Sequence, residues 1–250
     1  MSQGLSRRDL LKAAGLSSAA AVLPGGAQAQ VPVQPAEGAV HAGHAQPETE
    51  GLLFFFNDEE AQFIEAAVER LIPADPEWPG AGWAGVLYYI DRQLAAGYGA
   101  GARMYLDGPW VPDAPPQFGY QLRQSPAELY RIGIAETRLF VRERSNQQEF
   151  WDLDPGGMDR VLQALESGEA ALPSIPSPVF FETLLANTIE GFFADPAYGG
   201  NRDMVGWRMV GFPGAYAAYI DVVEDHGVAF ERRPISFADQ QARQDHIHGH

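Results

Sequence analysis

The sequence predicts an all-α fold: one helical domain whose helices are joined by long connections rich in glycine and proline. Apolar residues recur at helical spacing in several segments, and side chains that favour helix N-termini stand at the start of most of them. No segment shows the alternating pattern with regular turn spacing that is typical of a β-domain. Helices packed around one core are therefore the expected architecture.

The first helix is predicted from Asn57, a good N-cap, followed by three acidic residues at the positive end of the helix dipole. Its apolar face is expected to consist of Phe63, Ile64, Ala67, Val68, Leu71 and Ile72, and Pro73 ends the run. A second helix is expected up to Gly97, with Val86, Leu87, Ile90 and Leu94 on one face. Residues 98–124 have no sustained period, so we expect a long ordered loop, which in compact domains often belongs to a contact surface.

Three more helices are predicted from their N-terminal signals. Ser125 and Glu128 form a capping box, with Pro126 at the first helical position. A further helix opens at Asp154-Pro155 and is closed by Gly168, and Ser177-Pro178 is expected to cap the next one. The expected apolar residues are Leu129, Ile132, Leu139 and Phe140 in the first, Val161, Leu162 and Leu165 in the second, and Phe181, Leu184, Leu185, Thr188, Ile189 and Phe192 in the third.

The N-terminus predicts export. Arg7 and Arg8, followed by Leu10 and Leu11, match a twin-arginine signal, and an apolar run and a small-residue cleavage site follow. We therefore expect a signal peptide over residues 1–29, export by the twin-arginine translocase and a periplasmic mature chain. A flexible leader at 30–51, a helical domain at 52–230 and a flexible, histidine-containing tail at 231–250 are expected to follow.

Composition excludes several classes of function. The chain has no cysteine, which rules out disulfides, thiolate-bound iron–sulfur clusters and covalent c-type haem. Beyond residue 29 it carries 14 basic and 32 acidic residues, a net charge of about −18, so nucleic acid is not an expected partner. Lys12 is the only lysine, so a mature chain could not form a lysine Schiff base.

The candidate chemical motifs do not predict an active site. Gly97–Ala102 has the letters of a dinucleotide fingerprint but follows an expected helix, whereas the fingerprint must follow a strand. No histidine has a glutamate three residues before it, as a di-iron bundle requires, and the 32 acids make chance carboxylate pairs inevitable. We therefore predict no catalytic residue, no bound cofactor and no metal in this chain.

Residues 190–214 combine glycines, turn signals and aromatic side chains at a helix exit. Two interpretations fit this segment about equally well. It could be a tight connection whose aromatic side chains pack on one another, or a surface that binds a partner. Here the chain resembles the small (gamma) subunit of gluconate 2-dehydrogenase, known as subunit 3, over roughly residues 53–226. The residues that carry the resemblance, together the motif segment, are Gly191, Phe192, Phe193, Asp195, Pro196, Tyr198, Gly199, Gly200, Asn201, Gly206, Trp207, Val210, Gly211, Phe212, Pro213 and Gly214.

The resemblance implies a non-catalytic subunit of a membrane-associated dehydrogenase complex. In that family the large subunit holds FAD and oxidises the sugar, sugar acid or polyol, and a multi-haem cytochrome c subunit passes electrons to the quinone pool. The gamma subunit is implied to help the flavoprotein fold and to escort it through the twin-arginine translocase, and to lie at the inner membrane through its partners. A partner surface is expected along residues 73–124, at Trp78, Trp83, Tyr98, Tyr105, Trp110, Phe118 and Tyr120.

Two alternatives remain open at this point. One is a self-sufficient periplasmic enzyme that uses carboxylates around Asp195 and Asn201 on a sugar. The other is a stand-alone sugar-binding module, which aromatic and Asn/Asp side chains in one loop would suit. The substrate of the complex is not fixed by this chain, because in the family it is set by the flavin subunit.

Overall fold

The computed structural model describes residues 51–111, 114–214, 222–228 and 232–239, all of which belong to one compact unit, Gln46–His250. Within these residues the secondary structure is helical, and the β pairing is limited to an isolated bridge between Gly214 and Ile235. The predicted all-α fold is confirmed. The twin-arginine signal, the leader up to residue 50 and the C-terminal histidines lie outside the described residues.

The first two described helices follow the sequence prediction. Helix α2 spans Asp58–Leu71, and Asn57 caps it through a capping box with Glu60. Helix α3 spans Val86–Ala95 and begins after Gly85, whose φ of 75° is in the left-handed region that favours glycine. The connection between them is held by Glu69, whose carboxylate accepts hydrogen bonds from the backbone N–H groups of Ala74 and Gly82.

The long connection after α3 contains only a short 3₁₀ turn, η2 (Pro116–Phe118), among its described residues. Helix α4 (Pro126–Arg144) then starts with the predicted capping box. Its buried face differs from expectation: Tyr130, Ile134 and Val141 are buried, whereas Leu139 is 56% exposed. Because the core-facing stripe includes Gly133, against which the Phe180 ring packs closely, Leu139 is turned to the opposite side of α4.

The next helices are separated by short irregular segments. A 3₁₀ turn, η3 (Phe150–Asp152), precedes α5 (Pro155–Ser167), which Asp154 caps and Gly168 ends with a φ of 81°, as predicted. Helix α6 spans Ser177–Phe193. The predicted Ser177 cap is wrong: Pro176 is the N-cap, and Ser177 is the first helical residue and is buried. Proline at the second position starts the helix without a side-chain cap.

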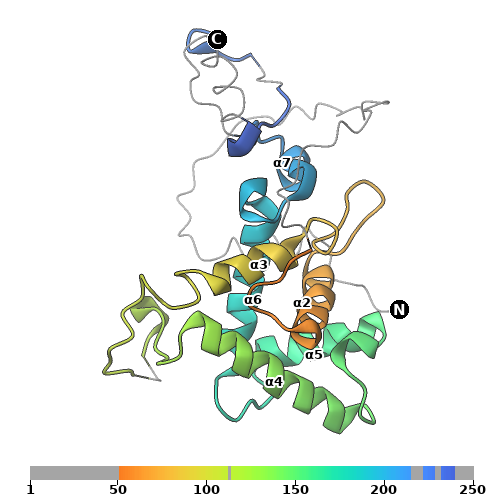
Figure 1. The fold of residues 1–250 in the computed structure, drawn as a ribbon, viewed down its shortest axis with the longest axis vertical. Helices are drawn as coiled ribbons and strands as arrows, with labels where there is room; N and C mark the ends of the chain where they lie inside the picture. Colours follow the sequence, from red (N-terminus) through yellow and green to blue (C-terminus); the bar gives the residue numbers. More distant parts are fainter. Residues whose placement is uncertain (1–50, 112–113, 215–221, 229–231, 240–250) are drawn as a thin grey trace, which may run out of the picture. The chain divides into compact units, whose positions relative to one another are not determined.

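Helix α6 is the centre of the fold, since it contacts α2, α3, α4, α5 and α7 (Figure 1). Around it lies an aromatic core in which the Phe63 ring is 4.8 Å from that of Phe150 and 6.5 Å from that of Phe180. The Tyr130 ring meets the Phe180 ring edge-on, with 5.8 Å between the ring centres.

After α6 come the 3₁₀ turns η4 (Pro196–Tyr198) and η5 (Arg202–Met204), and then α7 (Val205–Val210). No helix in the described part of the chain has the length and hydropathy that crossing a membrane requires.

Candidate functional site

The motif segment closes the C-terminal end of α6 with two side chains. Asn201 is fully buried; its Nδ2 donates to the carbonyl of Ala194 at 2.7 Å, and its Oδ1 accepts from Gly206 N at 2.7 Å. Trp207 Nε1 donates to the carbonyl of Phe193 at 2.7 Å. Carbonyls at a helix end lack helical partners, so these two side chains supply the bonds that α6 cannot make itself and tie α7 to it.

Three glycines of the motif segment allow this packing. A Cβ at Gly200 would lie 2.1 Å from the carbonyl oxygen of Gly191, and one at Gly206 would lie 2.2 Å from that of Phe192. Gly191 itself faces Tyr89 of α3, whose ring carbon would lie 2.8 Å from an added Cβ. The first two contacts are with backbone, which cannot move aside, so only glycine fits there.

Three residues of the same turn have left-handed backbone although they are not glycine. Asn201, Asp203 and Met204 have φ values of 49°, 52° and 55°. Such conformations cost free energy and persist where the surroundings hold them. Here the buried amide of Asn201 and the buried side chain of Met204 provide that hold.

The rest of the motif segment binds a later part of the chain. Asp195 caps η4 by accepting from Ala197 N, and its other oxygen accepts from Phe237 N at 2.7 Å. Gly214 pairs with Ile235, which is 9% exposed. Residues 232–239, which the sequence places beyond the end of the domain, therefore contact the motif segment in this structure.

Most residues of the motif segment are thus buried or half-buried and have a structural role. Gly191, Phe192, Gly200, Asn201, Gly206, Trp207 and Gly214 are buried, and Phe193, Asp195, Pro196, Gly199 and Pro213 are half-buried. The exposed ones are Tyr198, Val210, Gly211 and Phe212, and Phe212 meets Trp207 edge-on at 5.2 Å. The carboxylate of Asp195 and the amide of Asn201 both serve backbone groups, which argues against their use on a sugar.

The long connection after α3 forms the second part of the candidate site. We call its residues 100–124 the aromatic arm. The base of the arm is closed by a hydrogen bond between its flanking residues, since the N–H of Ala127 donates to the carbonyl of Gly99 at 3.0 Å. The start of the arm is also fixed, because the N–H of Ala102 donates to the carbonyl of Gly97 at 2.9 Å. Within the arm, the Tyr120 hydroxyl donates to the carbonyl of Gln124 at 2.8 Å.

A buried amide supports that base. Asn187 of α6 is 3% exposed, and its Nδ2 donates to the hydroxyl of Tyr130 at 3.0 Å. The Tyr98 hydroxyl, directly before the arm, lies 3.3 Å from both Nδ2 and Oδ1 of Asn187. Sequence analysis missed Asn187, although a polar residue between Leu184 and Gly191 on the most regular apolar face of the chain is a usable signal.

The arm carries four exposed large apolar side chains: Tyr105 (99% exposed), Trp110 (41%), Val111 (52%) and Phe118 (71%). Tyr98, directly before the arm, and Trp83, before the start of α3, are also exposed, as expected. Trp78 and Tyr120 are half-buried and correct that part of the predicted surface. Monomeric proteins seldom expose such a group of aromatics without a use, because binding surfaces favour them.

Between the arm and the motif segment lies a polar tyrosine, Tyr89 of α3. Its burial, followed by the nearby carboxylate of Glu190, raises the pKa of Tyr89 to about 12. Burial also raises the pKa of Glu190 above its ordinary value. At neutral pH Tyr89 is a hydroxyl donor to Glu190, which links α3 to the end of α6.

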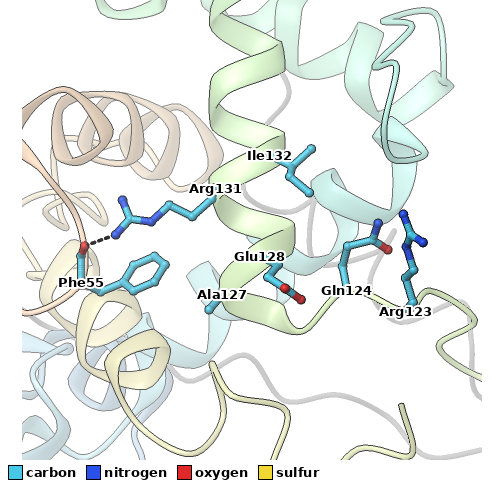
Figure 2. A pocket seen from close by; sticks show the side chains of 7 residues that line it. All are labelled: Phe55, Arg123, Gln124, Ala127, Glu128, Arg131 and Ile132. Carbon is cyan, nitrogen blue, oxygen red and sulfur yellow. Dashed lines mark hydrogen bonds between the residues drawn. The ribbon is translucent and has the colours of Figure 1, made fainter. Parts of the chain in front are cut away.

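A cleft of about 520 Å³ opens where α4 begins (Figure 2). It is lined by Phe55, Arg123, Gln124, Ala127, Glu128, Arg131 and Ile132. Arg131 lies 4.1 Å from the Phe55 ring centre, donates to the Phe55 carbonyl and pairs with Glu60, so its charge is used within the chain. In Figure 2, Arg123 lies on the side of α4 opposite to Phe55 and Arg131.

The described residues contain no group of three or more side chains placed to hold a metal ion.

The profile of the gluconate 2-dehydrogenase subunit 3 family matches residues 58–214, well over half of the chain. The chain belongs to this family. The match ends at Gly214, the last residue of the motif segment, and runs from α2 through α7, so it includes both the scaffold of the motif and the arm. No curated protein and no solved structure matches the chain.

Membership of the gluconate 2-dehydrogenase subunit 3 family makes this chain an accessory subunit of a dehydrogenase complex. The family resemblance stated from the motif residues is thereby confirmed. The structure shows the role of the motif: its glycines, Asn201 and Trp207 build the end of α6. Exposed apolar side chains lie on the aromatic arm, and also on the motif segment at Tyr198, Val210 and Phe212.

Proposed function

We propose that this chain is the non-catalytic small subunit of a periplasmic, membrane-associated, FAD-dependent dehydrogenase of sugars, sugar acids or polyols. Its partners are the large FAD-containing subunit and a multi-haem cytochrome c subunit. It helps the large subunit fold and accompanies it through the twin-arginine translocase, using the signal around Arg7 and Arg8 for both.

The observation that carries the proposal is the aromatic arm: four exposed apolar side chains on a loop whose start and base are fixed by the hydrogen bonds from Ala102 to Gly97 and from Ala127 to Gly99. A surface held in place before binding loses less conformational entropy when a partner covers it. Tyrosine, tryptophan and phenylalanine are also the side chains that contribute most at protein interfaces.

Charge agrees with this choice of surface. The chain carries a formal net charge of −16, yet the arm holds Arg103 and Arg123 against Asp107 and Asp113 and is neutral. An acidic or neutral partner therefore meets the least repulsion at the arm. Burial of its aromatics would supply the affinity.

The first experiment is a pull-down of the chain from its native membrane and periplasmic fractions. A yellow eluate with flavin absorbance, dye-linked dehydrogenase activity and a second polypeptide of flavoprotein size supports the proposal. A colourless eluate with one polypeptide contradicts it, and calorimetric titration with gluconate and glucose would then test the sugar-binding alternative.

The arm is tested in the same assay. Phe118→Ala and Tyr105→Ala remove exposed rings whose side chains make no hydrogen bond with the described residues, so folding is preserved. If these rings are central contacts, recovery of the flavoprotein falls at least about tenfold. Tyr198→Ala, at an exposed aromatic of the motif segment, is the matched control. Loss of the flavoprotein in the control but not in the arm variants would place the interface at the motif segment instead.

A further inference from the structure

The outward face of α4 carries a stripe of residues that no other described helix covers, although Arg142 at its end bonds Glu149, the residue that caps η3. One side of α4 packs on α6, α3 and η3. The opposite side presents, at helical spacing, Glu128, Ile132, Ala135, Leu139, Arg142 and Glu143, of which Ile132 and Arg142 are half-buried and the others exposed. Leu139 is 56% exposed. An apolar centre flanked by charges is the usual composition of a helix that packs on another helix.

The stripe is symmetric about Ala135. Ile132 and Leu139 lie one turn before and one turn after it, and Glu128 and Arg142 lie two turns before and after. An antiparallel copy of the same helix, crossing at Ala135, would place unlike charges and like apolar groups opposite each other. A small residue at the crossing point lets two helices approach closely.

We propose that α4 pairs with α4 of a second copy of this chain, antiparallel and centred on Ala135. Ile132 then packs on Leu139 of the second copy, and Glu128 faces Arg142 of the second copy. Both contacts occur twice, because a two-fold axis makes such an interface self-complementary. Arg142 remains bonded to Glu149 through Nε and Nη2, and its Nη1 is the group that faces Glu128 of the second copy.

The cleft at the start of α4 fits this register. Residue 127 lies opposite residue 143 of the second copy, so Glu143 of that copy reaches the cleft lined by Ala127 and Arg123 (Figure 2). Among the described residues Arg123 has no ion-pair partner, and Glu143 pairs only with its exposed neighbour Arg144. The second copy therefore supplies the carboxylate that this arginine lacks.

The interface is small. Helix α4 has 19 residues and is about 28 Å long, and a pair of such helices lies at the low end of the areas buried by specific complexes. The dimer is therefore expected to be reversible, with a micromolar or weaker dissociation constant. This inference concerns the chain by itself and does not depend on the proposed function.

Sedimentation velocity of the purified full chain over a concentration series tests the pairing. The weight-average mass rises from monomer towards dimer as concentration increases. Leu139→Glu places a carboxylate against Ile132 of the second copy and keeps the chain monomeric throughout the series. Val111→Glu, an equally exposed apolar residue of the aromatic arm, is the matched control and dimerises as the unmodified chain does.

A charge exchange keeps the test independent of Leu139. Arg123→Glu and Glu143→Arg each weaken the dimer about tenfold, because each brings like charges together in the cleft. The double variant restores the dissociation constant to within about threefold, as a direct pair requires. A chain that stays monomeric, a dimer that survives Leu139→Glu, or single variants whose effects add without rescue would overturn the proposal. The proposal would also be overturned if the flavoprotein complex held a single copy of this chain and Leu139→Glu released the flavoprotein from it. That result would mean that this face of α4 binds the flavoprotein.

Discussion

Asn201 shows how one side chain can determine a local structure. Its amide is buried and completes the bonding of two backbone groups, Ala194 O and Gly206 N, in a turn where its own backbone is left-handed. Asparagine tolerates that conformation better than most residues, and its side chain both donates and accepts. The motif segment therefore requires asparagine at this position for a structural reason.

Replacement of Asn201 by alanine is expected to lower the free energy of unfolding by about 2–4 kcal/mol, since two buried backbone groups lose their partners. Urea denaturation followed by tryptophan fluorescence measures this. Tyr198→Ala, exposed on the same segment, is the control and should change stability by no more than about 0.5 kcal/mol. An Asn201→Ala chain as stable as the control would mean that the turn does not depend on the amide.

Tyr89 and Tyr120 give the fold a dependence on alkaline pH. Burial is the largest cause that raises the pKa of each to about 12. A tyrosine with a raised pKa stabilises the fold below its unfolded value of about 10, and this contribution is lost as pH rises through about 12. We expect stability to fall between these pH values.

Absorbance titration of tyrosinate measures the effect directly. Some tyrosines should titrate near pH 10 and a late fraction near pH 12. Tyr89→Phe and Tyr120→Phe should each remove part of that late fraction. A uniform titration near pH 10 in the folded chain would refute the assignment.

At the scale of elements, Asp91 fixes the point where the chain enters the domain. Its carboxylate, buried in α3, accepts from the backbone N–H groups of Phe54, Phe55 and Phe56 at 2.7, 3.0 and 2.8 Å. Three charge-assisted bonds to consecutive amides compensate the desolvation of this buried charge. Arg131 holds the same segment from the other side through the Phe55 carbonyl.

Asp91→Asn is expected to destabilise the chain by about 2–5 kcal/mol, because an amide offers only one acceptor oxygen to three donors and brings two donors of its own. Hydrogen exchange should show the amides of residues 54–56 exchanging faster than those of α5. Glu143→Gln, at the exposed ion pair with Arg144, is the control for the loss of a carboxylate, with a cost of about 1 kcal/mol or less. Unchanged exchange at residues 54–56 would contradict the anchoring role.

The helices were largely predictable because their signals are local. Asn57, Ser125, Asp154 and Gly168 cap helices in the structure as their positions in the sequence predict. Ser177 was misassigned because Pro176 and Pro178 permit two starting points one residue apart. The turn at which a helix begins is thus easier to predict than the single residue that caps it.

The site was less predictable because it depends on contacts between distant residues. The motif segment could be recognised, but the bond from Asn201 to Ala194 and the closeness of Gly200 to Gly191 appear only when α6, η5 and α7 are assembled. Asp91 and Asn187 lie on otherwise apolar helix faces, and nothing in their immediate sequence names their partners. A buried polar residue signals that a partner exists, and the fold decides which one.

At the scale of the whole molecule, the proposed export function predicts that this chain and its flavoprotein partner reach the periplasm together. Replacement of Arg7 and Arg8 by lysine keeps the charge but removes the twin-arginine motif, so this chain and its flavoprotein partner should both accumulate in the cytoplasm. Fractionation with dehydrogenase assays measures this, and Arg103→Lys is the matched control. A flavoprotein that still reaches the periplasm would contradict the escort function while leaving the subunit assignment intact.

The central place of α6 also bears on the order in which the chain can fold during synthesis. Phe63 of α2 is made early, but its core neighbours Phe150 and Phe180 emerge much later, and the carbonyls that end α6 wait for Asn201 and Trp207. A ribosome-bound chain that stops before α6 therefore still exposes the apolar faces that pack on α6 in the finished domain. The finished domain forms after nearly all of it has been translated, so a partner that recognises the assembled surface binds only after that point.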